Sequence, residues 1–217
     1  TSSKDIQSFL YTWDNRWDLY KKLGYPTIKN LDDYEQLLIK EQKLCPKDDN
    51  GKKVYAVSLW PDWDGSMVMY VKATATAYYG YDEQGIGLYN VENGEYYDAL
   101  KKDGPYLQML KWYNNLYRDG LLDPDSMTQT YDQMATKVKN GGVLMSIFNY
   151  SGQLAYNTAD HTKKGKLMYC IKPEDATPIV YGMSTLGGNR VWSIGSKTKY
   201  PDLAMKVINY LSTPKGW

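Results

Sequence analysis

The sequence predicts an α/β fold, in which a mixed sheet is flanked by helices. Segments with helical spacing alternate with short apolar runs typical of strands along the whole chain. Gly, Pro and Asn residues separate these segments where elements are expected to end. The 217 residues, 42% hydrophobic and 24% charged, are typical of a globular protein and suffice for one large domain. No internal repeat interrupts this pattern.

Charge and residue counts exclude several classes of function. The formal net charge is +1, so nothing in the composition calls for nucleic acid or an anionic membrane surface as a partner. The single histidine, His161, argues against a histidine-based catalytic or zinc site. Cys45 and Cys170 are far apart and have no metal-binding spacing, which favours two free thiols over a disulfide. We therefore expect no cofactor.

The aromatic content is unusual, with 22 Tyr and 7 Trp but only 2 Phe. Tyr and Trp combine a broad apolar face with a polar tip, which suits ligand walls and wet interfaces better than dry cores. A compositional bias of the lineage explains the same counts equally well. Composition alone therefore does not decide whether these rings bind a ligand.

Two helices are predicted at the start of the chain. Residues at spacings of three and four share one helical face: Leu10, Trp13, Trp17, Tyr20 and Leu23. Gly24 and Pro26 end this helix. The second helix runs over 31–44, with Asn30 as N-cap and Asp33 in a shortened version of a capping box.

The stretch over 54–66 reads as a buried strand that leads into an aromatic and acidic loop. Val54, Val57 and Leu59 form a short apolar run, and Pro61 ends it because proline cannot continue a ladder. Two tryptophans and two carboxylates follow within five positions: Trp60, Asp62, Trp63 and Asp64. Ligands of open α/β sheets sit beyond the carboxyl ends of strands, so this loop is a candidate sugar site.

The middle of the chain predicts a helix, a loop, a hairpin and a second helix. The apolar run over 66–79 is too long for a typical strand, which favours a buried helix. A loop is expected over 80–87, and Asn93-Gly94 predicts a hairpin between residues 88–91 and 95–97. Asp103 is the predicted cap of a helix that closes at Gly120.

Helices and strands continue to alternate in the last hundred residues. The pattern predicts helix Tyr131–Lys139, strand Val143–Phe148, helix Leu154–His161, strand Lys166–Ile171, strand Val191–Ile194 and a helix from Pro201 with a buried apolar face. Asn149 and Tyr150 directly follow one strand, and Arg190 enters another. These strand ends add polar and aromatic side chains to the candidate site.

Several stretches together resemble a known family. They are Trp17–Pro26, Leu31–Leu38, Asn50–Leu59, Tyr117–Pro124, Arg190–Ile194 and Tyr200–Ala204. In this order and spacing the set is similar to extracellular solute-binding proteins of carbohydrate ABC transporters, in the lipoprotein form common in Gram-positive bacteria. None of the stretches is specific alone, since a helix that ends in Gly-x-Pro is common.

The resemblance implies a periplasmic-binding-protein-like fold of two α/β lobes that close on a sugar. It implies that residues 1–217 are one lobe, largely the second, with 180–217 near the hinge. An N-terminal lobe with a signal peptide and a lipid-anchoring cysteine is then expected before Thr1. It further implies a monomeric, non-enzymatic protein at the cell surface, whose partners are a carbohydrate and the permease, with no nucleic acid and with membrane contact only through the lipid anchor.

The resemblance also implies a set of ligand contacts at strand ends. The matching positions are Trp60, Trp63, Asp64, Asn149, Tyr150, Arg190 and Trp192. Aromatic rings would cover the apolar face of the sugar, while Asp, Asn and Arg would bond its hydroxyls. Two of these positions have a structural alternative, because Trp192 also fits a core-facing strand position and Tyr150 fits a helix start.

Two other classes of function fit parts of the same sequence. A carbohydrate-active enzyme, such as a glycoside hydrolase, could use Asp62 or Asp64 with a second carboxylate. An interaction lobe could meet a protein partner through a tyrosine-rich surface. The motifs of other enzyme classes are missing, since there is neither a phosphate-binding glycine loop nor a Gly-x-Ser-x-Gly elbow.

Overall fold

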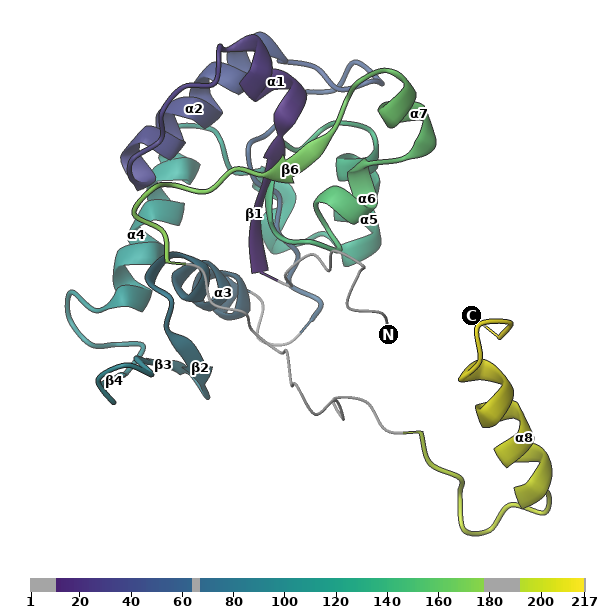
Figure 1. Ribbon diagram of the computed structural model, residues 1–217. Helices are drawn as coiled ribbons and strands as arrows, with labels where there is room; N and C mark the ends of the chain where they lie inside the picture. Colours follow the sequence, from purple (N-terminus) through teal and green to yellow (C-terminus); the bar gives the residue numbers. More distant parts are fainter. Residues whose placement is uncertain (1–10, 64–66, 178–191, 217) are drawn as a thin grey trace. The chain divides into compact units, whose positions relative to one another are not determined.

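The computed structural model describes residues 11–63, 67–177 and 192–216. The chain divides into two compact units, Thr1–Tyr181 and Gly182–Trp217. The described part of the first unit combines two small sheets with flanking helices (Figure 1). The predicted α/β class is therefore confirmed. That both units belong to one lobe stays a prediction.

The central sheet has the strand order β5-β1-β6, with β1 antiparallel to both neighbours. Its strands are β1 (Tyr11–Arg16), β5 (Met145–Phe148) and β6 (Met168–Cys170). The predicted helix over 10–23 is wrong for residues 11–16, and only α1 (Trp17–Lys22) is helical. All six residues of β1 are buried, so the strand lacks the alternation that marks a half-exposed strand. Leu10 lies outside the described residues.

The predicted buried strand from Val54 is an extended segment that pairs through isolated bridges on both sides. Tyr55 is bridged in parallel to Val143, and Val57 in parallel to Leu122. The amide of Ala56 donates to the Leu121 carbonyl at 2.7 Å. Apart from the partly buried Tyr55, the segment is buried through Trp60. It therefore runs in the same direction as the chain entering β5, and both end on one side of the unit.

Four long helices of the first unit match the predicted ones. They are α2 (Leu31–Leu44), α3 (Met67–Tyr79), α4 (Pro105–Arg118) and α5 (Tyr131–Lys139). The Asn30 side chain accepts from the Asp33 amide at 3.0 Å, but the Asp33 carboxylate bonds the Lys29 amide instead of closing a capping box. A full capping box lies at Thr130 and Gln133. The N-cap of α4 is Gly104, not the predicted Asp103.

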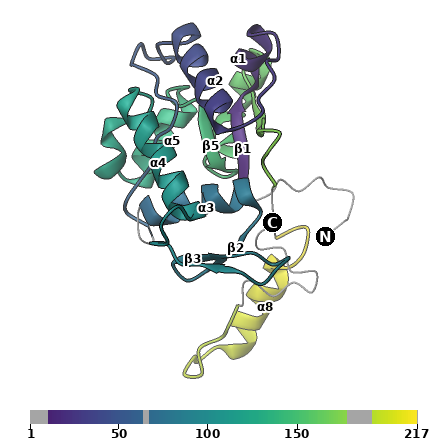
Figure 2. The ribbon, with the colours of Figure 1, turned by 90° about the vertical axis from the view of Figure 1, so that its left-hand side faces the viewer.

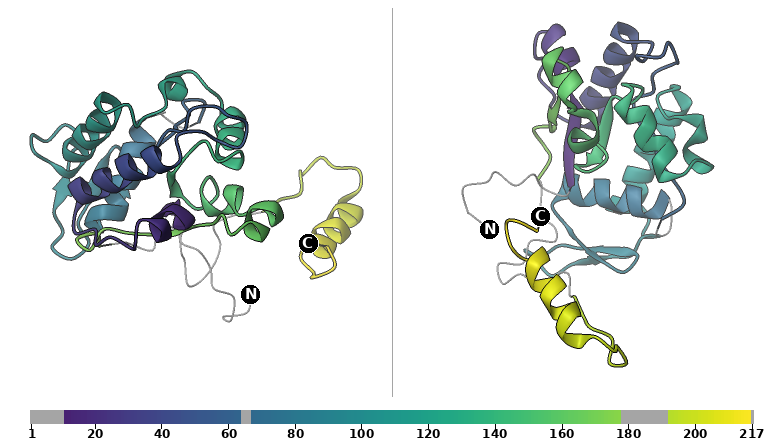
Figure 3. Two further views of the ribbon diagram at one scale, coloured as in Figure 1. Left: turned by 90° about the horizontal axis from the view of Figure 1, so that it is seen from above. Right: turned by 90° about the vertical axis from the view of Figure 1, so that its right-hand side faces the viewer.

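A second sheet of order β2-β3-β4 packs on the far side of α3 (Figures 2 and 3). Its strands are β2 (Asp82–Gln84), β3 (Gly87–Tyr89) and β4 (Tyr96–Tyr97). The predicted hairpin is present as β3 and β4. The prediction of a loop over 80–87 is wrong in part, because three polar residues in it form β2. They lack the apolar pattern of a strand and are extended because they pair with β3.

The remaining elements of the first unit are short. They are the 3₁₀ helix η1 (Pro124–Met127), α6 (Gln153–Tyr156) and α7 (Ala159–Lys163). The helix predicted over 154–161 is thus interrupted, because the Thr158 hydroxyl caps a new helix at the His161 amide. Cys45 and Cys170 are free, as predicted.

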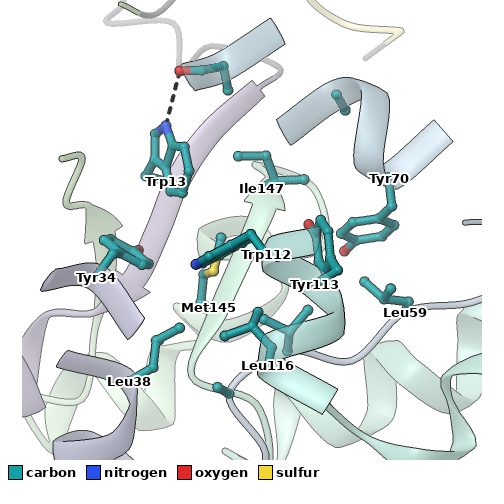
Figure 4. Close-up of a cluster of buried hydrophobic side chains, with 14 of the residues drawn as sticks. Trp13, Tyr34, Leu38, Leu59, Tyr70, Trp112, Tyr113, Leu116, Met145 and Ile147 are labelled. Carbon is teal, nitrogen blue, oxygen red and sulfur yellow. Dashed lines mark hydrogen bonds between the residues drawn. The ribbon is translucent and has the colours of Figure 1, made fainter. Parts of the chain in front are cut away.

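Buried aromatic rings hold the first unit together. Trp13 of β1 lies 5.1 Å from the ring of Tyr34 and 6.3 Å from that of Trp112, both centroid to centroid. Figure 4 shows these rings between β1, α2 and α4, and the bond from the Trp13 indole nitrogen to the Ala77 carbonyl at 3.2 Å. Side chains from four segments therefore share one core.

The described part of the second unit contains one helix, α8 (Pro201–Leu211), which begins at the predicted proline. Its predicted apolar face is not buried, since α8 has no buried residue. The strand predicted over 191–194 is not found in residues 192–194, and Val191 lies outside the described residues. None of the described helices combines the length and the apolar character that a bilayer crossing requires.

Candidate functional site

Two chain segments end at one cluster of aromatic rings. The extended segment from Val54 ends at Trp60, and β5 ends at Phe148. The ring centroids of Trp60 lie 6.0 Å from Phe148 and 6.3 Å from Tyr150. The two strand ends that were predicted to carry site residues are therefore close in space, because their segments run in parallel.

Three rings of this cluster, one exposed and two partly buried, form what we call the aromatic platform: Trp63, Tyr131 and Tyr150. Trp63 stacks on Tyr131 at 4.4 Å with an interplanar angle of 27°, and on Tyr150 at 6.0 Å with 30°. The Trp63 side chain keeps 43% of its surface exposed. Stacking covers the tyrosine faces that Trp63 contacts, so the apolar surface open to solvent is mainly that of Trp63 itself.

Trp60 supports the platform from below. It is only 1% exposed, and it meets Trp63, Tyr131 and Tyr70 edge to face at 5.1 to 5.4 Å. Its indole N–H is buried without an acceptor among the described residues. Trp60 therefore offers no surface to a ligand in this structure, although the sequence placed it among the contacts.

Asp62 fixes the platform in place. Its two carboxylate oxygens accept from the backbone amide of Tyr131 at 3.1 and 3.3 Å. That amide is the first of α5, one of the N-terminal groups with no partner inside the helix. The bond ties two segments 69 positions apart and sets Tyr131 against Trp63. Asp62 thus has a structural role that occupies its carboxylate.

The phenol groups of the platform stay protonated at neutral pH. Burial raises the pKa of Tyr131, and the charge of Asp132 raises it further. Burial is also the main cause of the raised pKa of Tyr150, followed by the nearby Tyr131. Neutral hydroxyls can both donate and accept hydrogen bonds, which matches the hydroxyls of a sugar.

The structure brings together some of the predicted site residues. Trp63, Asn149 and Tyr150 lie at the adjoining strand ends, with Trp60 beneath them. Asp64 and Arg190 lie outside the described residues. Trp192 is 70% exposed and belongs to the second unit. Whether any of these residues contacts a ligand stays a prediction.

Tyr131 is the platform residue that sequence reasoning missed. It was expected only as the start of a helix, and it lies far in sequence from Trp63. The sequence does contain a signal for this position, because Tyr131 directly follows the N-cap Thr130. The side chain of the first helical residue projects from the start of the helix. Nothing in the sequence, however, showed that this helix starts beside residue 63.

Other cavities lie away from the strand ends. A groove of about 600 Å³ runs beside α4, with Tyr79, Gln108, Lys111 and Asn115 in its wall. A polar hollow of about 500 Å³ lies along α5 and includes Gln133 and Lys137. In the part of the chain that the structure describes, no group of three or more His, Cys, Asp or Glu side chains could hold a metal ion.

The chain is similar in structure to a known binding protein. No family model and no curated protein matches the chain. Among solved structures, it is similar to the ABC-transporter substrate-binding protein FusA of S. pneumoniae, an EF-hand mutant in complex with fructo-nystose. The sequence identity is 18% and the TM-score is 0.43. The match covers 67% of this chain, which spans 29% of the FusA chain.

Proposed function

We propose that this chain is a non-catalytic binding protein that holds a sugar or oligosaccharide on the aromatic platform. The observation that carries the proposal is the exposed Trp63, stacked on Tyr131 and held on a rigid floor. The C–H face of a sugar ring is apolar and flat, so it packs on such a surface. Because Trp60 and Asp62 already fix the rings, little ordering entropy is lost on binding.

Transport is the role we infer for this binding. The sequence resembles solute-binding proteins of carbohydrate ABC transporters, which pass their ligand to a permease. On this proposal the chain acts outside the cell on a lipid anchor, and Asn149 and Tyr150 bond the sugar hydroxyls. Asp64, Arg190 and Trp192 are further proposed contacts.

Fluorescence titration of the chain with mono- and oligosaccharides tests the proposal. We expect a saturable change with at least one sugar, which Trp63→Ala weakens about tenfold and Tyr117→Ala leaves unchanged. Tyr117 is a matched control, because it is an exposed aromatic residue on α4. Equal affinity in the two variants would show that the platform is not the site.

A hydrolase is the rival function, and of its two candidate carboxylates the one that the structure describes, Asp62, is bonded to the Tyr131 amide. Product analysis after incubation with the bound sugar separates the two functions. We expect the sugar to remain intact. Turnover that disappears in Asp62→Asn, while the variant still folds and binds, would replace the binding-protein proposal by the enzyme.

A further inference from the structure

A second candidate site lies at the opposite end of β1 from the aromatic platform. Tyr11 at one end of the strand pairs with Phe148, next to the platform, and Arg16 is at the other end. Six residues of strand separate the two ends by about 17 Å. At the Arg16 end, a cavity of about 240 Å³ lies between the start of α1, the turn at 45–49 and the turn at 164–166. Figure 1 shows α1 and α7 at this end of the unit.

Arg16 is the buried cation of this cavity. It is 3% exposed, and its Nε and Nη2 each donate to the Asp18 carboxylate at 2.8 Å. The guanidinium also lies over the Tyr156 ring, 4.8 Å from the centroid. These contacts fix its orientation, because a bidentate pair and a ring face together leave no rotational freedom.

One edge of the fixed guanidinium is left for a ligand. Arg16 Nη1 makes no hydrogen bond to any described residue, although the side chain is almost fully buried. A Cβ built at Gly141 would be 3.6 Å from Nη1, and both residues line the cavity. The Nη1 hydrogens therefore lie at the cavity wall, where an anion can accept from them.

Lysines from three segments add to the positive charge. Lys22, Lys47 and Lys164 line the cavity, are exposed and have no ion pair within the described ranges. A fourth lysine, Lys166, is paired with Asp49. The Asp49 carboxylate also lies 3.2 Å from Nε2 of His161.

Two of the three carboxylates in the lining are already neutralised by cations. These are Asp18 and Asp49. The third, Asp48, accepts from the backbone amides of Asn50 and Lys52 through one oxygen. Lys22, Lys47 and Lys164 therefore outnumber the one carboxylate without a cationic partner.

We propose that this cavity binds a phosphate group, either as the free ion or as a monoester. A phosphate accepts hydrogen bonds in several directions, which matches one guanidinium edge and lysines that approach from separate segments. The volume lies below the roughly 300 Å³ at which pockets for larger organic ligands begin, so an oligosaccharide does not fit. The site is independent of the platform and of the function proposed for it.

Cysteine alkylation offers a direct test with an internal control. Cys45 lines the cavity and is half-buried, while Cys170 is exposed and lies outside the lining. The rates of iodoacetamide labelling at both residues are measured by mass spectrometry with sodium phosphate, and with sodium chloride at equal ionic strength. We expect phosphate to slow labelling of Cys45 several-fold and to leave Cys170 unchanged. No slowing, or equal slowing by chloride, would overturn the proposal.

Lysine variants test whether phosphate protects Cys45 by binding in the cavity. The double variant Lys47→Gln/Lys164→Gln removes two exposed charges and leaves the buried Arg16 pair intact. We expect it to raise the phosphate concentration for half-protection at least about fivefold, whereas Lys111→Gln on α4 leaves it unchanged. An unchanged value in the double variant would contradict the proposal. Protection by glycerol phosphate at similar concentrations indicates a monoester ligand, and its absence indicates the free ion.

Discussion

The core around Trp13 and the platform around Trp63 use the same residue types in opposite ways. In the core, Trp13 meets Tyr34 and Trp112 edge to face, at interplanar angles of 67° and 65°. On the platform, Trp63 is nearly parallel to Tyr131 and Tyr150, at 27° and 30°. Edge-to-face packing fills a volume, whereas parallel rings leave a flat face open. The angle alone does not separate the two kinds of ring, since the buried Phe148 is also nearly parallel to Tyr150, at 22°. Exposure separates them, because Trp63 is 43% exposed and Trp13 is 1% exposed.

The polar tips of two core rings also differ from those of the platform, although the Trp112 indole nitrogen is buried without a hydrogen bond among the described residues. The Trp13 nitrogen donates to the Ala77 carbonyl, and the Tyr113 hydroxyl bonds Thr74 at 2.7 Å, so both tips are satisfied inside the core. No hydrogen bond is found for the Tyr131 and Tyr150 hydroxyls within the described residues. Hydroxyls without protein partners are available to water or to a ligand.

Removing the core ring is expected to have the largest effect. Trp13→Ala should lower the free energy of unfolding by about 3–5 kcal/mol, because it leaves a large cavity beside Tyr34 and Trp112. Trp63→Ala should lower it by less than about 1 kcal/mol, since that ring is 43% exposed. Urea unfolding of both variants measures the contrast. Equal losses would show that the two regions do not differ as described.

A change of pH should alter the stability of the core and leave sugar binding by the platform unchanged. Burial raises the pKa of Asp14 in β1 to about 7, against the hydrogen bonds from Gln153 and Thr12 that lower it. The folded state therefore keeps a proton that the unfolded chain releases near pH 4. The stability from this proton is fully present below pH 4 and is lost as the pH rises through about 7.

We expect the free energy of unfolding to fall between pH 4 and pH 8, with Asp14 contributing on the order of 4 kcal/mol. Asp14→Asn should reduce the slope of the profile, and the remaining slope comes from carboxyls such as Glu35 and Glu41, whose pKa values burial also raises. Asp160→Asn at an exposed position is the control, and the slope should be retained in it. Sugar affinity should stay constant from pH 5 to pH 9, because both platform phenols have raised pKa values. A profile that keeps its slope in Asp14→Asn would exclude this carboxyl as the cause.

Truncating the platform should change affinity by an intermediate amount. A tenfold loss in Trp63→Ala corresponds to about 1.4 kcal/mol of binding free energy. Trp63→Phe keeps a flat ring and should recover most of the affinity, which calorimetry can measure. If Phe binds no better than Ala, stacking on the ring is not the source of affinity.

The smallest expected effect concerns one hydroxyl of the core. Tyr113→Phe should cost about 1 kcal/mol of stability, because Thr74 keeps its bond to the Tyr70 carbonyl at 2.9 Å after the phenol is removed. Tyr150→Phe should leave stability unchanged and weaken only sugar binding. Thermal unfolding of the two variants tests this difference, and a larger loss in Tyr150→Phe would reverse it.

Sequence patterns predicted the helices better than the strands or the site. α2 and α5 have the predicted bounds, because each carries an N-cap and its own apolar face. β1 was read as a helix, because Trp13, Trp17 and Tyr20 happen to be spaced as on a helix while both faces of the strand are covered. Local spacing cannot show what covers a strand.

The site was predictable only up to its local loop. Two tryptophans three positions apart indicated the region of the site, but the burial of each depends on segments that are distant in sequence. Trp60 is buried under Tyr131 and Phe148, whereas Trp63 stays exposed. Likewise, the sequence makes Asp62 a candidate catalytic carboxylate, whereas in the structure it bonds the Tyr131 amide. These outcomes depend on contacts between residues about 70 to 90 positions apart.

The place of β1 in the sheet has a consequence for biosynthesis. β1 lies between β5 and β6, yet its pairing partner Met168 follows Arg16 by about 150 residues. At about 5–20 residues per second, the ribosome takes roughly 8–30 s to complete that stretch. Until β5 is made, about 130 residues after Arg16, β1 has both edges unpaired, which is a situation in which nascent chains aggregate. A binding factor that shields this strand on the ribosome would raise the yield of folded protein.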